Sequence, residues 1–280
     1  MNKFKNNLAE VFRDARKHLE VAGIIADHLT CKCDVRDEAL NNLELKHAGS
    51  ILDLGCGFGF FTRALQGRVG CDAAITGIDR YPEYEQLYLE SCKTAGLKGN
   101  FRGSGISALS EIPGNSIDLV ICSYAMYFFP WIIPELMHKL KPYALFVIIT
   151  HAIPHMREFT NYVRSILRDR QIEVSGQLPY EKLIGQFSNR NACEQLDPYF
   201  NRIERKRFTS KLLFNEKDYD DFVKYFRFKH RFFIPKDSET ELEDFILKAI
   251  KNDMKNGKSF KITKDDMIFI CSHPQKDIKQ

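Results

Sequence analysis

The chain has 280 residues, of which 44% are hydrophobic, and its 41 Lys and Arg residues against 37 Asp and Glu residues give a formal net charge of +4. This composition supplies enough apolar material for a core and excludes global disorder, and so mild a charge does not demand a nucleic-acid partner. The sequence lacks a stretch of the ~20 apolar residues that a spanning helix needs, so we expect no membrane association.

The N-terminal residues 4–29 carry apolar side chains at helical spacing, which predicts one or two amphipathic helices. Their many charges are unlike the apolar segment of a secretory signal. Several of the 8 Cys residues fall inside apolar, strand-like runs, where a free Cys behaves as a small buried hydrophobe. We therefore expect reduced thiols and a cytoplasmic location. Cys31 and Cys33 are the only close pair, so a structural zinc is not expected. Pro154 lies between His151 and His155 and spoils a helical metal pair, so we predict no metal.

From residue 50 onward, short apolar runs alternate with helical stretches. Strands are predicted at 51–54, 74–78, 99–102, 117–122 and 144–150, with helices at 59–67, 83–95, 106–111 and 131–140 between them. This alternation is typical of a doubly wound, mostly parallel sheet in an α/β protein.

The C-terminal part is less regular than the first half. Helices are predicted at 155–170, 179–187, 216–228 and 238–256, and strands at 202–213 and 266–272. We expect residues 1–48 to form an N-terminal helical cap or lid and residues 49–280 to form the main α/β domain.

A glycine-rich turn follows the first predicted strand in "ILDLGCGFGFF", with Gly55, Gly57 and Gly59 at alternate positions. Such a turn lets a ligand approach the backbone and sets a helix N-terminus against it. Phe60 stands where the dinucleotide fingerprint needs its last glycine, and the phosphate loop is absent. Asp79 ends the second strand, where a carboxylate can accept hydrogen bonds from both hydroxyls of a ribose. The pattern therefore indicates an adenosine-type ligand without a pyrophosphate.

The stretch "LDLGCGFG" followed by "GID" resembles the first two motifs of class I S-adenosylmethionine-dependent methyltransferases. "GNSIDLVICSYAMYFFPWIIPELMHKLKPYALFVIIT" resembles the fourth strand, the following loop and helix, and the fifth strand of that family, so the resemblance covers roughly residues 45–152. It implies a Rossmann-like sheet of seven strands with the last one antiparallel, which suits 266–272. It also implies S-adenosylmethionine as the cofactor and S-adenosylhomocysteine as the product.

The resemblance implies a role for each residue around the glycine turn. Asp53 would meet the methionyl ammonium, with the backbone of Gly55 and Cys56 beside it. Asp79 would hold the ribose, and the side chain of Arg80 would lie along the adenine. From the residues alone, Asp53 could instead hold the turn, Asp79 could be an ordinary strand-end residue, and Arg80 could simply be solvated.

The adenine contact departs from the family pattern. The family commonly has an acidic residue after the third strand, whereas this sequence has "RGSGIS" there. Either Ser104, with the backbone of Gly105 or Ile106, contacts the adenine in its place, or a different geometry applies.

The methyl acceptor is expected beyond the fourth and fifth strands, near Ser123, Tyr124, Tyr127 and His151. A sulfonium is an activated methyl donor, so alignment does most of the work, and a base is needed only when the acceptor arrives protonated. His151 is the candidate base, since histidine titrates near neutrality; it could equally be a hydrogen-bonded loop residue. The aromatic side chains of "SYAMYFFPW" could hold a sulfonium or an amine, or pack the next helix on the sheet.

The stretches "RFTSKLLFNEKDYDDFVKYF" and "ELEDFILKAIKNDMKNGKSFKITKDDMIFICS" are similar in order and texture to the tail of histamine N-methyltransferase and related small-molecule enzymes. This similarity implies that residues 155–262 contribute to the acceptor pocket.

The leading hypothesis is methyl transfer to nitrogen or oxygen of a small molecule by a monomer or homodimer. One alternative is an RNA or protein methyltransferase, suggested by the basic stretches "RIERKRF" and "KYFRFKHRFF", although nucleic acid is not the expected partner. Another alternative is a binding protein that keeps the fold without catalysis.

Overall fold

The computed structural model describes residues 8–171, 176–234 and 239–275. The chain divides into two compact units, each made of three segments. We call residues 1–32, 153–185 and 209–265 the helical unit, and residues 33–152, 186–208 and 266–280 the sheet unit. The N-terminal helices therefore share a unit with two later segments, and the sheet unit begins at Cys33 rather than at residue 49.

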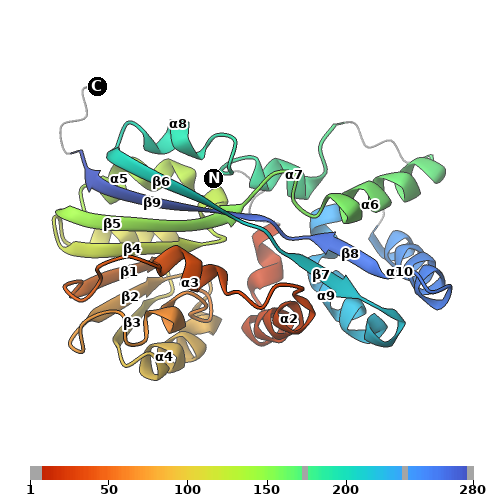
Figure 1. Ribbon diagram of the computed structural model, residues 1–280, viewed down its shortest axis with the longest axis horizontal. Helices are drawn as coiled ribbons and strands as arrows, with labels where there is room; N and C mark the ends of the chain where they lie inside the picture. The colour runs from red at the N-terminus through yellow and green to blue at the C-terminus, as the bar shows by residue number, and fades with distance from the viewer. Residues whose placement is uncertain (1–7, 172–175, 235–238, 276–280) are drawn as a thin grey trace. The chain divides into compact units, whose positions relative to one another are not determined.

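The sheet unit is built on one seven-stranded sheet in the order β3-β2-β1-β4-β5-β9-β6 (Figure 1). The strands are β1 (Ser50–Leu54), β2 (Ala74–Ile78), β3 (Lys98–Arg102), β4 (Ile117–Ser123), β5 (Leu140–His151), β6 (Phe200–Phe208) and β9 (Asp266–Pro274). The first five strands pair in parallel, and β9 runs antiparallel between β5 and β6. The predicted fold class, with its antiparallel last strand, is confirmed.

The central strands read as continuous apolar runs because both faces of the sheet are covered. Leu52 on β1, Ile121 on β4 and Val147 on β5 are all completely buried. Before the first strand the sheet unit has α3 (Val35–Leu40). Its helices between strands are η2 (Thr62–Leu65), η3 (Pro82–Tyr84), α4 (Glu85–Thr94), η4 (Gly105–Glu111), η5 (Met126–Phe128), η6 (Pro130–Ile132), α5 (Ile133–Met137) and α8 (Ala192–Leu196).

The helix predicted over 59–67 is wrong in type: it is reduced to the single 3-10 turn η2. Gly59 and Gly67 have φ of +81° and +68° at its two ends. A left-handed residue at each end interrupts the helical backbone, so no helix can extend past either glycine. The segment predicted as a helix over 106–111 is likewise a 3-10 helix, η4, and the one predicted over 131–140 is split into η6 and α5.

The single strand predicted over 202–213 is in fact two strands. β6 belongs to the seven-stranded sheet, whereas β7 (Lys211–Phe214) pairs with β8 (Phe260–Thr263) in a two-stranded sheet of the helical unit. Ser210, between β6 and β7, donates its hydroxyl to the Lys264 carbonyl at 2.8 Å. The sequence showed no β-breaking glycine or proline here, and neither β8 nor α8 was predicted.

The helical unit packs its helices around a phenylalanine-rich core. Its helices are η1 (Glu10–Phe12), α2 (Ala15–His28), α6 (Arg157–Asp169), α7 (Pro179–Ile184), η7 (Glu216–Asp218), α9 (Tyr219–Phe233) and α10 (Glu239–Lys255). Phe159 on α6 contacts Phe226 and Phe233 on α9 and Phe260 on β8 edge to face, with ring centroids 4.5–6.0 Å apart. Such edge-to-face contacts add stability beyond the burial of area.

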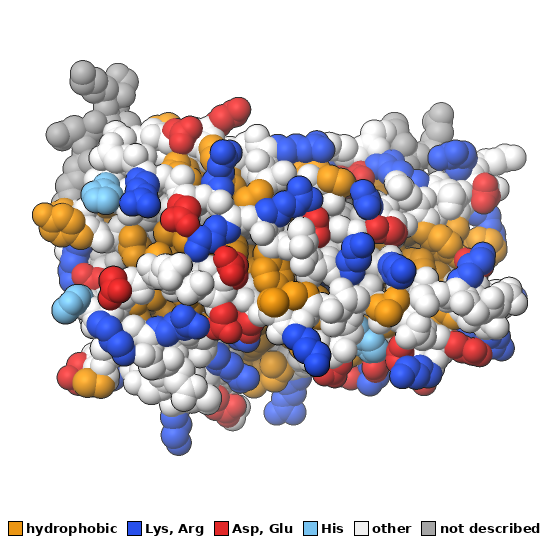
Figure 2. Space-filling model, in the orientation of Figure 1, with side chains coloured by type: hydrophobic (Ala, Val, Ile, Leu, Met, Phe, Trp, Pro, Cys, Tyr) orange, Lys and Arg blue, Asp and Glu red, His pale blue; other side chains and the backbone are white. Residues whose placement is uncertain are grey.

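Acidic and basic side chains are interspersed over the face of the molecule drawn in Figure 2. This agrees with the small net charge of the sequence. In the part of the chain that the structure describes, none of the helices combines the length and apolar character required to span a bilayer.

Candidate active site

The predicted site residues of the sheet unit gather at one edge of the sheet. β1, β2, β4 and β5 run in parallel and place their carboxyl ends there. β9 runs the other way, so its first residue, Asp266, lies beside the last residue of β5, His151. This edge is where open α/β sheets bind their ligands.

The glycine turn is held to the end of β2 by main-chain hydrogen bonds. Gly55 N–H and Cys56 N–H donate to the carbonyl of Ile78 at 2.8 and 3.2 Å, which leaves carbonyls rather than amides on this stretch to meet an ammonium. Gly55, Gly57 and Gly59 all have positive φ, between +49° and +81°, a region that only glycine visits at low cost. Cys56 is buried, and burial raises the pKa of its thiol, so the thiol stays neutral.

The three glycines differ in what surrounds them. A Cβ on Gly55 would lie 2.3 Å from Cβ of Ala125, and one on Gly59 would lie 2.6 Å from Cβ of Ser91. At Gly57 the nearest atom would be in the Tyr84 ring, 3.9 Å away. Gly55 and Gly59 are therefore required for packing inside the unit, and Gly57 is where a ligand can approach the backbone.

Asp53 is a buried carboxylate at the end of β1. Its Oδ2 accepts a hydrogen bond of 2.7 Å from the buried hydroxyl of Thr62. Burial raises the pKa of Asp53 to about 7, helped by the charge of Asp79 and opposed by the Thr62 hydrogen bond. A carboxylate whose ionised form is costly in the free protein gains from a cationic ligand. The interpretation that Asp53 holds the turn also has a basis, in its bond to Thr62.

Asp79 connects the glycine turn with the end of β2. Its two carboxylate oxygens accept the backbone N–H of Gly57 at 2.9 Å and of Tyr81 at 3.1 Å. Burial raises the pKa of Asp79, against the effect of these bonds. Each carboxylate oxygen has a second lone pair, so the group can still accept from ribose hydroxyls. Gly105 N–H donates to the Asp79 carbonyl at 2.8 Å, which brings the loop after β3 to the same place.

Arg80 and Ser104 are the most exposed of the predicted cofactor residues. The guanidinium of Arg80 lies 5.6 Å from the centre of the Tyr81 ring. Ser104 precedes η4, and its carbonyl accepts the Ser107 hydroxyl at 2.9 Å. Both residues lie in the loops that carry Asp79 and Gly105, and their contact with adenine stays a prediction.

Among the residues predicted near the methyl acceptor, Tyr124 lies directly after Ser123, the half-buried last residue of β4. Tyr124 has φ of +54°, which is costly for a side chain of this size. Its hydroxyl donates to Oδ2 of Asp266 at 2.8 Å. Burial and the charge of Asp266 raise the pKa of Tyr124 well above its ordinary value, so the phenol keeps its proton.

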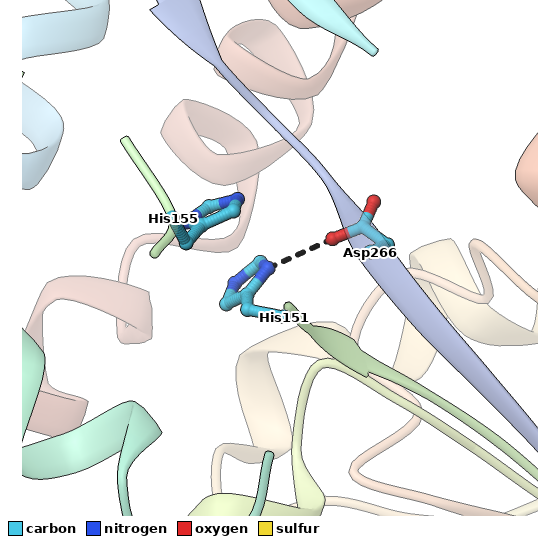
Figure 3. Close-up of side chains that lie close together, drawn as sticks. All are labelled: His151, His155 and Asp266. Carbon is cyan, nitrogen blue, oxygen red and sulfur yellow. Dashed lines mark hydrogen bonds and ion pairs between the residues drawn. The ribbon is translucent and has the colours of Figure 1, made fainter. Parts of the chain in front are cut away.

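His151 is buried and lies between two tyrosine rings. Its ring is stacked with Tyr124 at 4.9 Å and with Tyr127 at 5.8 Å between centroids. Its Nδ1 lies 3.0 Å from Oδ1 of Asp266, and Figure 3 shows the ring turned toward that carboxylate. Tyr127 is buried too, and burial raises its pKa. The structure thus brings the three predicted acceptor-side residues together.

Sequence reasoning missed Asp266 and Thr62. Asp266 comes 115 positions after His151, and its only signal was its place as the first residue of the final predicted strand. No pattern in the sequence indicated Thr62. The packing alternative for the aromatic loop is wrong for Trp131, which is 53% exposed. Phe129 lies against the glycine turn instead, with its ring 3.5 Å from where a Cβ on Gly55 would be.

Comparison with known proteins identifies a family that part of this chain matches. Residues 51–143 match the family model described as a methyltransferase domain. No curated protein matches the sequence. A candidate methyltransferase from Bacillus halodurans C-125 has a solved structure similar to this chain, with a TM-score of 0.53 and 14% identity, over 86% of this chain and 99% of that one. The YcgJ protein from Bacillus subtilis gives a TM-score of 0.50 and 16% identity over 92% and 99%.

At these sequence identities the two solved structures support the fold of this chain alone. The family model covers the stretch that holds the glycine turn, Asp79 and Tyr124. The residues present suit the cofactor of that domain, because a ligand can approach the backbone at Gly57 and two carboxylates, Asp53 and Asp79, lie at the ends of the neighbouring strands β1 and β2. The chain therefore carries a methyltransferase domain over residues 51–143 and is an S-adenosylmethionine-dependent methyltransferase.

Proposed function

We propose that this enzyme methylates a nitrogen or oxygen atom of a small molecule. Asp53, the turn from Gly55 to Gly59, and Asp79 would hold the cofactor. Tyr124, Tyr127 and His151 would form the acceptor side. The observation that carries the proposal is the compact cluster of two tyrosines, a histidine and a carboxylate at the ends of β4, β5 and β9.

When bound, S-adenosylmethionine supplies a methyl group already activated on a sulfonium. The protein then has to align the acceptor, and alignment can account for roughly 7–11 kcal/mol of the barrier. Asp53 would accept from the methionyl ammonium, and the open side of Gly57 would contact the ligand through its backbone. The tyrosine rings offer faces on which a cation rests favourably.

The charges at this edge do not favour RNA as the acceptor. Asp34, Asp53, Asp79 and Asp266 lie in the segments around it, and Arg36 is occupied by Asp34 and by the Phe60 carbonyl. A nucleic acid needs Lys and Arg that neutralise phosphates. This edge instead suits a neutral or cationic acceptor.

The basic stretches that suggested RNA have other roles in their own units. In "KYFRFKHRFF", the Phe226, Phe228, Phe232 and Phe233 side chains are buried in the helical unit. Lys224 pairs with Glu20 at 2.9 Å and Arg227 with Glu243 at 2.9 Å. "RIERKRF" is β6, at the edge of the sheet farthest from β3, where charged residues discourage pairing with another sheet.

The C-terminal third resembles histamine N-methyltransferase in the order of its segments rather than in matched sequence, and we take this resemblance as the second support for a small acceptor. Residues 155–262 run through both units, and their contribution to the acceptor pocket is part of the proposal.

The acceptor class is tested by methyl transfer from S-adenosylmethionine labelled on the methyl group. Pooled amines, pooled phenols and carboxylates, total RNA and denatured protein are offered in parallel. We expect label only in the small-molecule fractions, and label that enters RNA and is lost after nuclease treatment would contradict the proposal.

The cofactor residues are tested by calorimetry with S-adenosylhomocysteine on wild type and Asp79→Asn. Removal of one partner from charge-assisted hydrogen bonds costs about 1.5–3 kcal/mol, which corresponds to a dissociation constant roughly 10- to 150-fold higher. Asp72→Asn is the matched control, because Asp72 is an exposed carboxylate paired with Lys98 before β2.

Because Asp79 also holds the N–H of Gly57 and Tyr81, affinity alone does not identify a ribose contact. The 2′-deoxy analogue of the ligand supplies the second arm of a thermodynamic cycle. We expect loss of the 2′-hydroxyl to cost wild type more than it costs Asp79→Asn. Equal losses in the two proteins would assign Asp79 to the turn alone.

A further inference from the structure

We propose that Asp266 is a positioning residue for methyl transfer: it orients His151 so that Nε2 takes the proton of an acceptor O–H or N–H. This inference rests on the proposed function of the same site and adds to it the class of acceptor, one that loses a proton as it is methylated. Asp266 was not among the residues that the sequence indicated.

The sheet itself places the two residues opposite each other. His151 ends β5, Asp266 begins β9, and they are directly paired in the antiparallel register. Directly opposed residues of an antiparallel pair have side chains close enough to interact. Both side chains are buried, and Nδ1 of His151 lies 3.0 Å from Oδ1 of Asp266.

The hydrogen bonds around Asp266 define which nitrogen of His151 carries the proton. The two carboxylate oxygens each face a different donor: Oδ2 accepts from the Tyr124 hydroxyl at 2.8 Å, and Oδ1 faces Nδ1. An ionised carboxylate only accepts, so Nδ1 of His151 is the protonated nitrogen. Nε2 is then the basic nitrogen, and a carboxylate behind the ring stabilises the imidazolium that forms.

Tyr124 gives independent support for a built site. Its backbone is left-handed at φ +54°, a conformation that costs a non-glycine residue of the order of 1–3 kcal/mol. That backbone is held by the bond from Tyr124 N–H to the Ile149 carbonyl at 2.8 Å. This conformation directs the Tyr124 hydroxyl at Asp266 and stacks the Tyr124 ring on the His151 ring. The Tyr127 ring also stacks on the His151 ring.

The step balances without any further reactant. A lone pair on the acceptor oxygen or nitrogen forms the bond to the methyl carbon as the carbon–sulfur bond breaks, and that electron pair stays on sulfur as a neutral thioether. The acceptor proton passes to Nε2 of His151, which becomes an imidazolium held by Asp266, and it leaves to water after the product has gone.

The first test needs no turnover. Protein labelled with [¹⁵N]histidine is examined by NMR at neutral pH, and the His151 signals are identified by their loss in His151→Gln. We expect the wild type to show the Nδ1–H tautomer at His151. An Nε2–H tautomer in the wild type would overturn the proposal, whatever the activity.

The second test compares Asp266→Asn with Asp118→Asn. Asp118 is a matched carboxylate that accepts the backbone N–H of Gly49 and Ser50 and pairs with Lys141. General base catalysis contributes about 10²–10⁴-fold, so we expect kcat of Asp266→Asn to fall at least 100-fold. The KM for cofactor and the affinity for S-adenosylhomocysteine should change less than threefold, and Asp118→Asn should keep its kcat.

Each outcome separates this inference from the proposed function. Wild type that methylates only RNA or protein would refute the proposed function and leave the tautomer result standing. Small-molecule turnover that survives in a folded Asp266→Asn would refute the positioning role alone. A parallel loss of kcat and of S-adenosylhomocysteine affinity would also overturn it, because it would make Asp266 a structural residue of the sheet.

Discussion

Replacement of Gly55 by Ala should destabilise the sheet unit through two separable effects. Gly55 has φ of +67°, and a Cβ there would lie 2.3 Å from Cβ of Ala125. The left-handed conformation costs an alanine about 1–2 kcal/mol. Overpacking of a close contact costs about 1–3 kcal/mol more. We therefore expect Gly55→Ala to lower the free energy of unfolding by about 2–5 kcal/mol.

Gly67→Ala is the matched control for this substitution. Gly67 has nearly the same φ, +68°, and a Cβ there would meet open space among the described residues. It should therefore show only the conformational cost of about 1–2 kcal/mol. The difference between the two variants measures the contact with Ala125.

The assay is urea unfolding, with the free energy taken from the midpoint and slope of each variant. The double variant Gly55→Ala/Ala125→Gly removes the methyl group that the new Cβ meets. It should recover about 1–3 kcal/mol relative to the sum of the single changes. Gly55→Ala that costs no more than Gly67→Ala, or a double variant with no recovery, would refute the reasoning.

Two further predictions concern buried titratable groups. Burial raises the pKa of Asp53 to about 7. Between about pH 4 and 7 the folded chain therefore holds a proton that the unfolded chain has lost. The free energy of unfolding then falls by up to about 1.4 kcal/mol per pH unit as pH rises through this range. Asp53→Asn should lose this slope and exceed wild type in urea midpoint at pH 8, yet bind S-adenosylhomocysteine more weakly; a midpoint below wild type at pH 8 would contradict this. Burial, with the charge of Lys229, lowers the pKa of His18 to about 3, so its contribution is present above the unfolded value of 6.5 and is lost as pH falls from there toward 3. His18→Phe keeps a ring beside Phe228, 5.4 Å away in the wild type, and its thermal midpoint should depend less on pH between 6 and 4 than that of wild type.

The prediction of the parallel strands from the sequence succeeded because each is an apolar run bounded by turn residues. β2 was predicted with its exact bounds, and β1, β3 and β4 to within one residue at either end. β5 begins four residues earlier than predicted, at Leu140, because that residue pairs with Ile117 across an irregularity in the register. The glycine turn was predicted correctly because three glycines at alternate positions interrupt both helix and strand, so the chain has to turn directly after β1.

The division of 202–213 into two strands was not visible in the sequence. Both halves are rich in charged and β-compatible residues, so each could be an edge strand. Their separation depends on the partners, since β6 pairs with β9 and β7 pairs with β8. Strand pairing is a property of distant segments, and no local pattern encodes it.

The sequence by itself determined the fold class, the glycine turn after β1 and the aromatic loop after β4, because local hydrophobic periodicity and a glycine spacing are enough to specify them. Only the tertiary structure decided that Ala125 abuts Gly55, that Thr62 reaches Asp53, and that Asp266 lies opposite His151. These contacts depend on the register and close packing of segments far apart in the chain. Residue type and spacing say nothing about which buried group a carboxylate will meet, and the proposed role of Asp266 depends on that contact with His151.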